Sequence, residues 1–208
     1  MKKIILCDIG NTTADIYENG VCQKMILSEF KPELLAGDVW YVSVNHALSE
    51  RLQSLPNWHN IVTLIDWDKY YLTMGIDRIM VCEAIDDGVI VDAGSAITVD
   101  VMRDGVYQGG FISLGLRAAQ EAYARLSPAL ALSFNFEVDL TIMAKNTPDA
   151  ITVGFLAPLI QSIKSYGNPI YVTGGDAHLL SSFLEEVIVD ETLIFKGMKK
   201  LIDKGSKC

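Results

Sequence analysis

Residues 3–20, KIILCDIGNTTADIYENG, and residues 89–105, VIVDAGSAITVDVMRDG, follow one pattern. In each stretch a short apolar run ends in Asp, which is followed by an apolar residue, Gly, and hydroxyl or amide side chains. Each stretch then alternates apolar and polar residues, as a half-buried strand does, until it reaches a turn that contains Gly. The two copies predict that the chain contains a duplicated unit.

The first copy predicts strands, one helix and a further strand. Asn19-Gly20 is the strongest short hairpin signal in the chain, and Asn45 is well placed as a helix N-cap. The predicted strands cover residues 3–9, 13–18, 21–27, 39–45 and 60–66, and the predicted helix covers residues 47–55. This order predicts a mixed sheet rather than a purely parallel one.

The second copy repeats this order with longer helices. We predict strands at 89–94, 97–102, 106–113, 169–175 and 186–190, and helices at 78–85, 114–126, 148–166 and 177–185. The prediction is therefore an α/β protein built from a duplicated β-β-β-α-β-α unit. We expect the N-terminal half to cover residues 1–74 and the C-terminal half residues 75–208.

Composition excludes several classes of protein. The chain has 208 residues, of which half are hydrophobic and about a fifth charged, so a folded protein is expected. No apolar run reaches the roughly 18 residues that a membrane span needs. Asp8 interrupts the first apolar run too early for a signal peptide, which predicts a cytoplasmic protein. The formal net charge of −9, with one basic cluster at 196–207, disfavours nucleic-acid binding.

The cysteines do not predict a metal or disulfide site. Cys7, Cys22, Cys82 and Cys208 are scattered without C-x-x-C spacing or a nearby His pair. We interpret them as buried or incidental thiols.

The repeated motif has two interpretations. A carboxylate at a strand end beside the free N–H groups of a tight turn can hold a phosphate together with its cation. Two such turns across a cleft could hold the phosphates of one nucleotide. In the alternative, Asp8 and Asp92 only cap strand ends. For the pair of motifs we favour the phosphate interpretation, and the glycine-rich turns at 109–115 and 172–177 are further places of close backbone approach.

These motifs together resemble a known family, the type III pantothenate kinases of the acetate kinase, sugar kinase, Hsp70 and actin superfamily. The chain has DIGNT at 8–12, GIDR at 75–78, DAGSAITVD at 92–100, GGFISLG at 109–115 and TGGDA at 173–177. All five are in the family's order and span nearly the whole chain. The resemblance implies two ribonuclease H-like (actin-like ATPase) domains, each a mixed β-sheet with flanking helices, and a cleft between them.

The resemblance implies a function and a site. The family phosphorylates pantothenate with ATP and Mg²⁺ to 4′-phosphopantothenate, the first step of coenzyme A biosynthesis. It implies Asp77 as the catalytic base, and it assigns substrate contacts to Tyr71, Gly75, Ile76, Asp77, Arg78 and Thr147. The ATP contacts that it implies are Asp8, Ile9, Gly10, Asn11, Thr12, Thr13, Ala14, Asp15 and Ser95, with Asp92 as the ligand of a monovalent cation, K⁺ or NH₄⁺.

Three departures from the family pattern are visible. Ser95 stands where the family usually has Thr and keeps the hydroxyl group. Leu114 replaces a usual Pro, which changes the rigidity of that turn. The loop before GIDR is short, so either Tyr70 or Tyr71 could be the substrate-contacting tyrosine, and we choose Tyr71.

Some residues also have purely structural interpretations. Asp77 could pair with Arg78 at the surface or act as the N-cap of the next helix. Thr147 could be the N-cap of a helix with Pro148 in its first turn. The resemblance also implies a homodimer, for which the apolar helix at 150–163 is a candidate interface, although burial in its own core is an equal alternative.

Two other functions stay open from the sequence. ATP motifs belong to the fold whereas acceptor choice lies in loops, so a kinase for another small hydroxylated acceptor is the first alternative. A non-catalytic regulator is the second. The presence of Asp8, Asp77 and Asp92 together argues against it.

Overall fold

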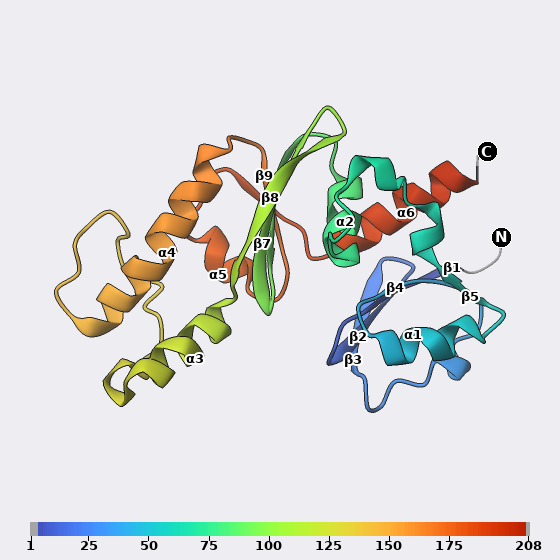
Figure 1. The fold of residues 1–208 in the computed structure, drawn as a ribbon, viewed down its shortest axis with the longest axis horizontal. Coiled ribbons are helices and arrows are strands. Elements are labelled where there is room, and N and C mark those ends of the chain that lie inside the picture. The colour runs from blue at the N-terminus through green and yellow to red at the C-terminus, as the bar shows by residue number, and fades with distance from the viewer. Residues whose placement is uncertain (1–3, 207–208) are drawn as a thin grey trace. The chain divides into compact units, whose positions relative to one another are not determined.

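The computed structural model describes residues 4–206, which form two units. The first unit combines the chain up to Asp86 with the segment from Thr192 onward, and the second unit is Asp87–Glu191. Each unit contains one five-stranded sheet with helices packed on it (Figure 1).

The first unit has a mixed sheet with the strand order β3-β2-β1-β4-β5. Its elements are β1 (Ile4–Ile9), β2 (Thr13–Glu18), β3 (Val21–Ile26), β4 (Asp38–Ser43), α1 (His46–Gln53), β5 (Trp58–Asn60), α2 (Ile76–Ala84) and α6 (Leu193–Gly205). The first three strands are antiparallel neighbours, whereas β4 and β5 run parallel to β1.

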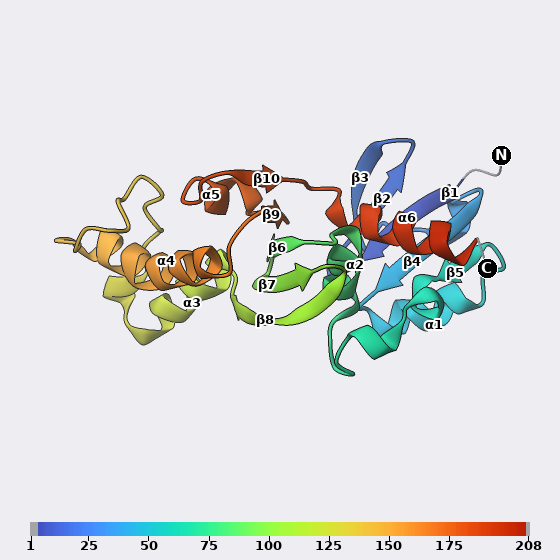
Figure 2. The ribbon, with the colours of Figure 1, turned by 90° about the horizontal axis from the view of Figure 1, so that it is seen from above.

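The second unit repeats this arrangement in the order β8-β7-β6-β9-β10 (Figure 2). Its elements are β6 (Gly88–Ala93), β7 (Ala96–Arg103), β8 (Val106–Leu114), α3 (Leu116–Leu126), α4 (Thr147–Ser165), β9 (Ile170–Thr173), α5 (Ala177–Ser181) and β10 (Val187–Val189). Strands β6, β7 and β8 are antiparallel neighbours, and β9 and β10 run parallel to β6. The predicted duplication of a mixed sheet with flanking helices is confirmed.

The hairpin turns of the two units match as well. Asn19 and Gly20 both have positive φ angles, 50° and 86°, and so do Asp104 and Gly105 at 51° and 73°. Two successive positive φ angles are the signature of a tight hairpin turn whose twist suits antiparallel strands. Both predicted turns therefore lie between the second and third strands of their units.

In each unit, one face of the sheet forms a core with helices of the same unit, and in the first unit α6 also packs against β1. In the first unit, alternate residues of β1 such as Ile5, Cys7 and Ile9 share a core with Leu52 of α1. In the second unit, strands β6, β7 and β9 share a core with α3, α4 and α5. The apolar residues of α4 lie in this core, among them Leu156 and Ile163, so α4 follows the core interpretation given above.

Helix α6 was not predicted from the sequence, which showed only a basic cluster at 196–207. It is amphipathic: Leu193, Phe195, Met198, Leu201 and Ile202 are buried, while its lysines lie between them. α6 packs against α2 so closely that a Cβ on Gly197 would lie 1.8 Å from the Met80 carbonyl oxygen.

The sequence prediction also differs from the structure in two other places. The strand predicted at 60–66 is wrong: β5 ends at Asn60, whose side chain accepts from Val62 N–H and starts a 3₁₀ helix, Ile61–Leu64. The expected halves, 1–74 and 75–208, place α2 and α6 in the C-terminal half, whereas both helices pack in the first unit. The reason is that α6 returns to cover α2 and β1.

Cys7 and Cys82 are buried, Cys22 is exposed, and Cys208 lies outside the described residues. Burial, followed by the nearby negative charges of Asp8 and Asp15, raises the pKa of the Cys7 thiol well above its usual range. Cys7 is therefore a protonated core residue. Within residues 4–206, no helix combines the length and apolarity that crossing a membrane would require.

Candidate functional site

The turn between β1 and β2 places two carboxylates side by side. Asp8 is the penultimate residue of β1 and pairs in register with Asp15 of β2. A hydrogen bond from Gly10 N–H to Thr13 O, 2.9 Å long, closes the turn and leaves Asn11 and Thr12 exposed. This turn, which also contains Ile9 and Ala14, presents hydroxyl and amide groups beside two acidic side chains.

Asp15 is held in an unfavourable environment for a charge. Burial raises its pKa above the ordinary value of 3.8, and Lys24, whose Nζ lies 3.5 Å from Oδ2, opposes the shift. The other oxygen, Oδ1, is buried and accepts no hydrogen bond from any described residue. A bound group that supplied positive charge or a donor would relieve this cost.

We expect Asp15→Asn to stabilise the protein at neutral pH. Because the folded state binds the Asp15 proton more tightly than the unfolded state does, this group favours folding fully below pH 3.8 and loses that contribution as pH rises through its folded pKa. The variant lacks this loss. Thermal unfolding between pH 4 and pH 7 measures this difference. The unfolding temperature of the variant should increase relative to that of the wild type as pH rises. A difference in unfolding temperature that does not change with pH would contradict the raised pKa of Asp15.

The turn between β6 and β7 is the counterpart in the second unit. Asp92 is again the penultimate strand residue, and Gly94 N–H donates to Ala96 O at 3.0 Å. Ala93 pairs with Ile97, whereas Ile9 pairs with Ala14 in the first unit, so this turn is one residue shorter. Ser95 is exposed at its tip.

Two glycines from other loops approach this second turn. A Cβ on Gly115, which precedes α3, would lie 2.4 Å from Ser95 O and 2.5 Å from Gly94 O. A Cβ on Gly174, which follows β9, would lie 2.4 Å from Asp92 Oδ1 and 2.6 Å from Ala93 O. Two glycine-rich segments of the second unit therefore converge on the turn at residues 92–95. Leu114, in place of the family's Pro, ends β8 opposite Ala96 and does not prevent this approach.

The convergence gathers oxygen atoms around one turn. These are the Asp92 carboxylate and the main-chain carbonyls of residues 93, 94 and 95. Carboxylate and carbonyl oxygens are the ligands that hard, weakly bound cations prefer. The turn thus contains oxygen donors of the kind that a cation would need, and one of them, Ala93 O, already accepts from Asp176 N–H at 2.9 Å.

We expect Gly174→Ala to destabilise the second unit by about 2 kcal/mol or more, because Gly174 has a φ of +90° and its Cβ would clash with Asp92 and Ala93. The matched control is Gly175→Ala, since a Cβ there meets nothing within 4 Å. Thermal unfolding of both variants measures the difference. Equal unfolding temperatures would mean that the loop does not approach the turn so closely.

The segment around GIDR lies in the first unit. Gly75 is the N-cap of α2, so the N-cap interpretation of Asp77 is wrong: Asp77 lies in the first helical turn. Its carboxylate folds back over Gly75, because a Cβ on Gly75 would lie 2.5 Å from Asp77 Oδ1. Asp77 Oδ1 also accepts from Arg78 N–H at 2.9 Å. Ile76, between them, is half-buried.

Arg78 and the two tyrosines resolve into two separate contacts. Arg78 is only 4% exposed, so the surface-pair interpretation does not hold. Its Nη1 donates to Tyr71 Oη at 2.6 Å, and its guanidinium lies 5.9 Å from the centre of the Tyr71 ring. Tyr70 is buried and donates to Glu83 instead. Tyr71, which is 45% exposed, is therefore the tyrosine beside Arg78.

Thr147 lies in the second unit, at the start of α4. The prediction that it caps this helix is wrong: Asn146 is the N-cap, and its side chain accepts from Asp149 N–H at 2.9 Å. Hydrogen bonds from Asn135 and Asn146 lower the pKa of Asp149. The Thr147 side chain is exposed and has no hydrogen bond to another described side chain.

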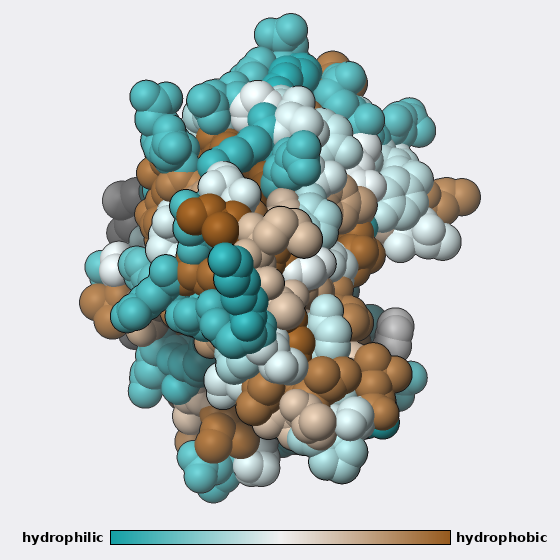
Figure 3. Space-filling view, turned by 90° about the vertical axis from the view of Figure 1, so that its left-hand side faces the viewer, coloured by the Kyte–Doolittle hydropathy of each residue, from teal (hydrophilic) through white to brown (hydrophobic). Residues whose placement is uncertain are grey.

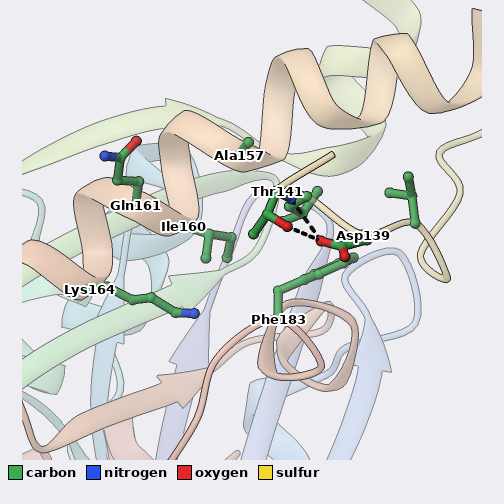
Figure 4. Close-up of a pocket in the computed structure, with 9 residues that line it drawn as sticks. Asp139, Thr141, Ala157, Ile160, Gln161, Lys164 and Phe183 are labelled. Carbon is green, nitrogen blue, oxygen red and sulfur yellow. Dashed lines mark hydrogen bonds between the residues drawn. The ribbon is translucent and has the colours of Figure 1, made fainter. Parts of the chain in front are cut away.

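A pocket of about 490 Å³ lies between α4 and the loop before it (Figure 4). Ile160, Gln161 and Lys164 of α4 line it, and Phe183 closes it from the other side. Asp139 accepts hydrogen bonds from the backbone and the hydroxyl of Thr141. None of the predicted site residues lines this pocket.

The end of the second unit that carries α3 and α4 has a mixed surface (Figure 3). Apolar patches lie among polar side chains in this view. The most exposed large apolar residues of this region are Leu126, Ile142 and Met143, at 76%, 62% and 85%.

Comparison with known proteins identifies the family. The family model for type III pantothenate kinase matches residues 57–168. A type III pantothenate kinase of Sulfurimonas denitrificans is 47% identical over 205 residues, covering 99% of this chain and 100% of the relative. One of Helicobacter hepaticus is 42% identical and covers 97% and 99%. The chain belongs to this family.

Solved structures agree on the fold of this type III pantothenate kinase family member. A crystal structure from Campylobacter jejuni, described as a Baf family transcriptional activator, is 35% identical, covers 98% of this chain and 100% of its own, and has a TM-score of 0.88. A structure described as a 2-dehydro-3-deoxygalactonokinase from Sinorhizobium meliloti, 11% identical, has a TM-score of 0.61 and covers 97% and 96%. The latter likeness shows the actin-like ATPase and sugar kinase fold alone.

Sequence reasoning missed one notable residue in this family member, Glu83. It is a carboxylate with a side chain only 4% exposed, and it follows the buried apolar residues 79–82 of α2. Its only sequence signal is its position among buried residues such as Val81 and Cys82. Its partner Lys204 lies 121 residues further along the chain, so spacing could not reveal that contact.

Proposed function

We propose that this protein phosphorylates pantothenate with ATP, giving 4′-phosphopantothenate and ADP, within coenzyme A biosynthesis. The observation that carries the proposal is the 47% identity to a type III pantothenate kinase along the full length of both chains. The kinase family implies ATP with a divalent metal ion.

Phosphoryl transfer asks the protein mainly for alignment and charge neutralisation. The substrate hydroxyl oxygen forms a bond to the γ-phosphorus, the bond from that phosphorus to the bridging oxygen of ADP breaks, and a base accepts the hydroxyl proton. We assign the base to Asp77. Its support is a carboxylate on the first turn of α2, held by Arg78 N–H and confined by Gly75.

The pantothenate contacts that we propose are Tyr71, Gly75, Ile76, Asp77, Arg78 and Thr147. Arg78 is suited to hold the pantothenate carboxylate because a guanidinium offers two parallel donors. Its contact with Tyr71 Oη, 2.6 Å long, supports a shared role. The exposed Thr147 side chain is compatible with a ligand contact.

The ATP contacts that we propose are the residues from Asp8 to Asp15 and Ser95. Asp8 would hold the Mg²⁺ that accompanies ATP, and the cation would neutralise phosphate charge. The buried, unpartnered oxygen of Asp15 supports a positively charged neighbour at this turn. We assign a monovalent cation, K⁺ or NH₄⁺, to Asp92, which the oxygen-rich turn at residues 92–95 supports.

We also propose a homodimer and a cytoplasmic location. The exposed apolar residues Leu126, Ile142 and Met143 support a dimer surface at that end of the second unit. The net charge of −9 opposes direct contact with DNA, which is the role that a transcriptional activator would need.

The test is ADP release by purified protein with Mg²⁺-ATP and pantothenate, in K⁺ and in Na⁺. We expect turnover that requires pantothenate and is faster in K⁺. Turnover with another hydroxylated acceptor only would favour the first alternative. No turnover with any acceptor in K⁺ would leave the regulatory alternative as the better one. Asp92→Asn should abolish the difference between the two salts if Asp92 holds the cation.

A further inference from the structure

We propose that Glu83 is a positioning residue for pantothenate binding. Its buried carboxylate holds Tyr70, and Tyr70 in turn orients Tyr71. This inference rests on the proposed function, because it concerns how Tyr71 and Arg78 are held for that substrate. All the groups involved belong to the first unit.

Within residues 4–206, Glu83 has three partners. Its Oε1 accepts from Tyr70 Oη at 3.1 Å, and Lys69 Nζ lies 3.8 Å from the same oxygen. Its Oε2 accepts from Lys204 Nζ of α6 at 3.0 Å. A carboxylate buried this deeply persists only when it is paired and hydrogen-bonded. The Glu83 side chain, 4% exposed, is therefore a fixed anchor with one phenol and two ammonium groups around it.

Tyr70 connects Glu83 to Tyr71, because Tyr70 is hydrogen-bonded to Glu83 and is the chain neighbour of Tyr71. The backbone of Tyr70 is extended, with φ −130° and ψ 154°, so successive side chains point in opposite directions. Tyr70 accordingly points into the core toward Glu83, while Tyr71 lies on Arg78. The two hydroxyl groups attach this segment to two points of α2, one near each end of the helix.

The arrangement separates anchoring from chemistry. Removing the Tyr70 hydroxyl leaves Asp77, Arg78 and Tyr71 in place as residues but frees the segment that orients Tyr71. The expected effect is a lower affinity for pantothenate, with the rate of the phosphoryl transfer step unchanged. Helix α6 contributes to the position of Glu83 through Lys204, although α6 lies far from Glu83 along the sequence.

The test compares Tyr70→Phe with the wild type in the ADP-release assay. We expect the KM for pantothenate to rise about tenfold, as loss of a hydrogen bond to a charged group allows, with kcat and the KM for ATP within about twofold. Lys204→Met, at a half-exposed position, should give a smaller rise in the same constant. The matched control is Tyr107→Phe, which also removes a phenol hydroxyl from a buried carboxylate, Asp100, at 3.0 Å. It should lower the unfolding temperature without changing the KM for pantothenate.

A double-mutant cycle with Tyr71→Phe decides whether Tyr70 acts through Tyr71. We expect Tyr70→Phe to raise the KM for pantothenate much less when Tyr71 is already Phe. An unchanged KM in active Tyr70→Phe and Lys204→Met proteins would overturn this inference alone. Additive effects in the cycle would overturn the route through Tyr71. Absence of pantothenate-dependent turnover in the wild type would instead overturn the proposed function, and this inference with it.

Discussion

Asp77→Asn is expected to lower kcat for pantothenate phosphorylation by a factor of about 10² to 10⁴, the usual contribution of a general base. Asparagine has nearly the same shape but cannot accept the hydroxyl proton. The fold should tolerate the change, because Asp77 is only half-buried and its Oδ1 can be replaced by an amide oxygen that still accepts from Arg78 N–H. Turnover near the wild-type rate would show that Asp77 is not the base.

The companion variant Gly75→Ala tests the position of the Asp77 carboxylate without changing its chemical identity. Its Cβ would lie 2.5 Å from Asp77 Oδ1, so the carboxylate must rotate away, while the backbone needs no shift. We expect a clear loss of kcat with almost no loss of thermal stability. A fall in unfolding temperature as large as the fall in activity would mean that Gly75 is a structural residue instead.

Gly197→Ala is expected to destabilise the first unit by about 3 kcal/mol or more, or roughly 10 °C in unfolding temperature. The new Cβ would lie 1.8 Å from Met80 O and 2.8 Å from Met80 C, both backbone atoms of α2. Neither helix can yield without separating from the other. This loss is a large part of the 5–15 kcal/mol that typically holds a domain together.

The control for Gly197→Ala is Gly154→Ala in α4. A Cβ at Gly154 meets nothing within 4 Å, so the higher helix propensity of Ala should stabilise by up to about 1 kcal/mol. The same substitution should therefore destabilise the protein at Gly197 and stabilise it at Gly154. Differential scanning calorimetry measures both. A neutral Gly197→Ala would contradict the close contact between α2 and α6.

The duplicated sheet could be predicted because its signals are local. Asn19-Gly20 and Asp104-Gly105 force hairpin turns through their backbone conformations, and the alternating strands beside them set the register. The predicted position of Asp8 and Asp92 at matching strand ends follows from the same periodicity. These features depend on residues that are neighbours along the chain.

Other features depend on contacts between distant segments and could not be predicted. In the sequence, the apolar residues of α6 are interspersed with lysines, so the apolar face was not recognised. Its partner α2 lies more than a hundred residues earlier. The contact of Glu83 with Lys204 of α6 likewise joins residues that are 121 positions apart. The roles of the site residues toward ATP, pantothenate and K⁺ stay predictions.

The first unit is completed by α6, whose residues are synthesised after those of the second unit. On a translating ribosome, the second unit, which is continuous from Asp87 to Glu191, can therefore mature before the unit that precedes it in sequence. Nascent chains stalled before residue 193 should expose α2 to protease while the second unit is already resistant.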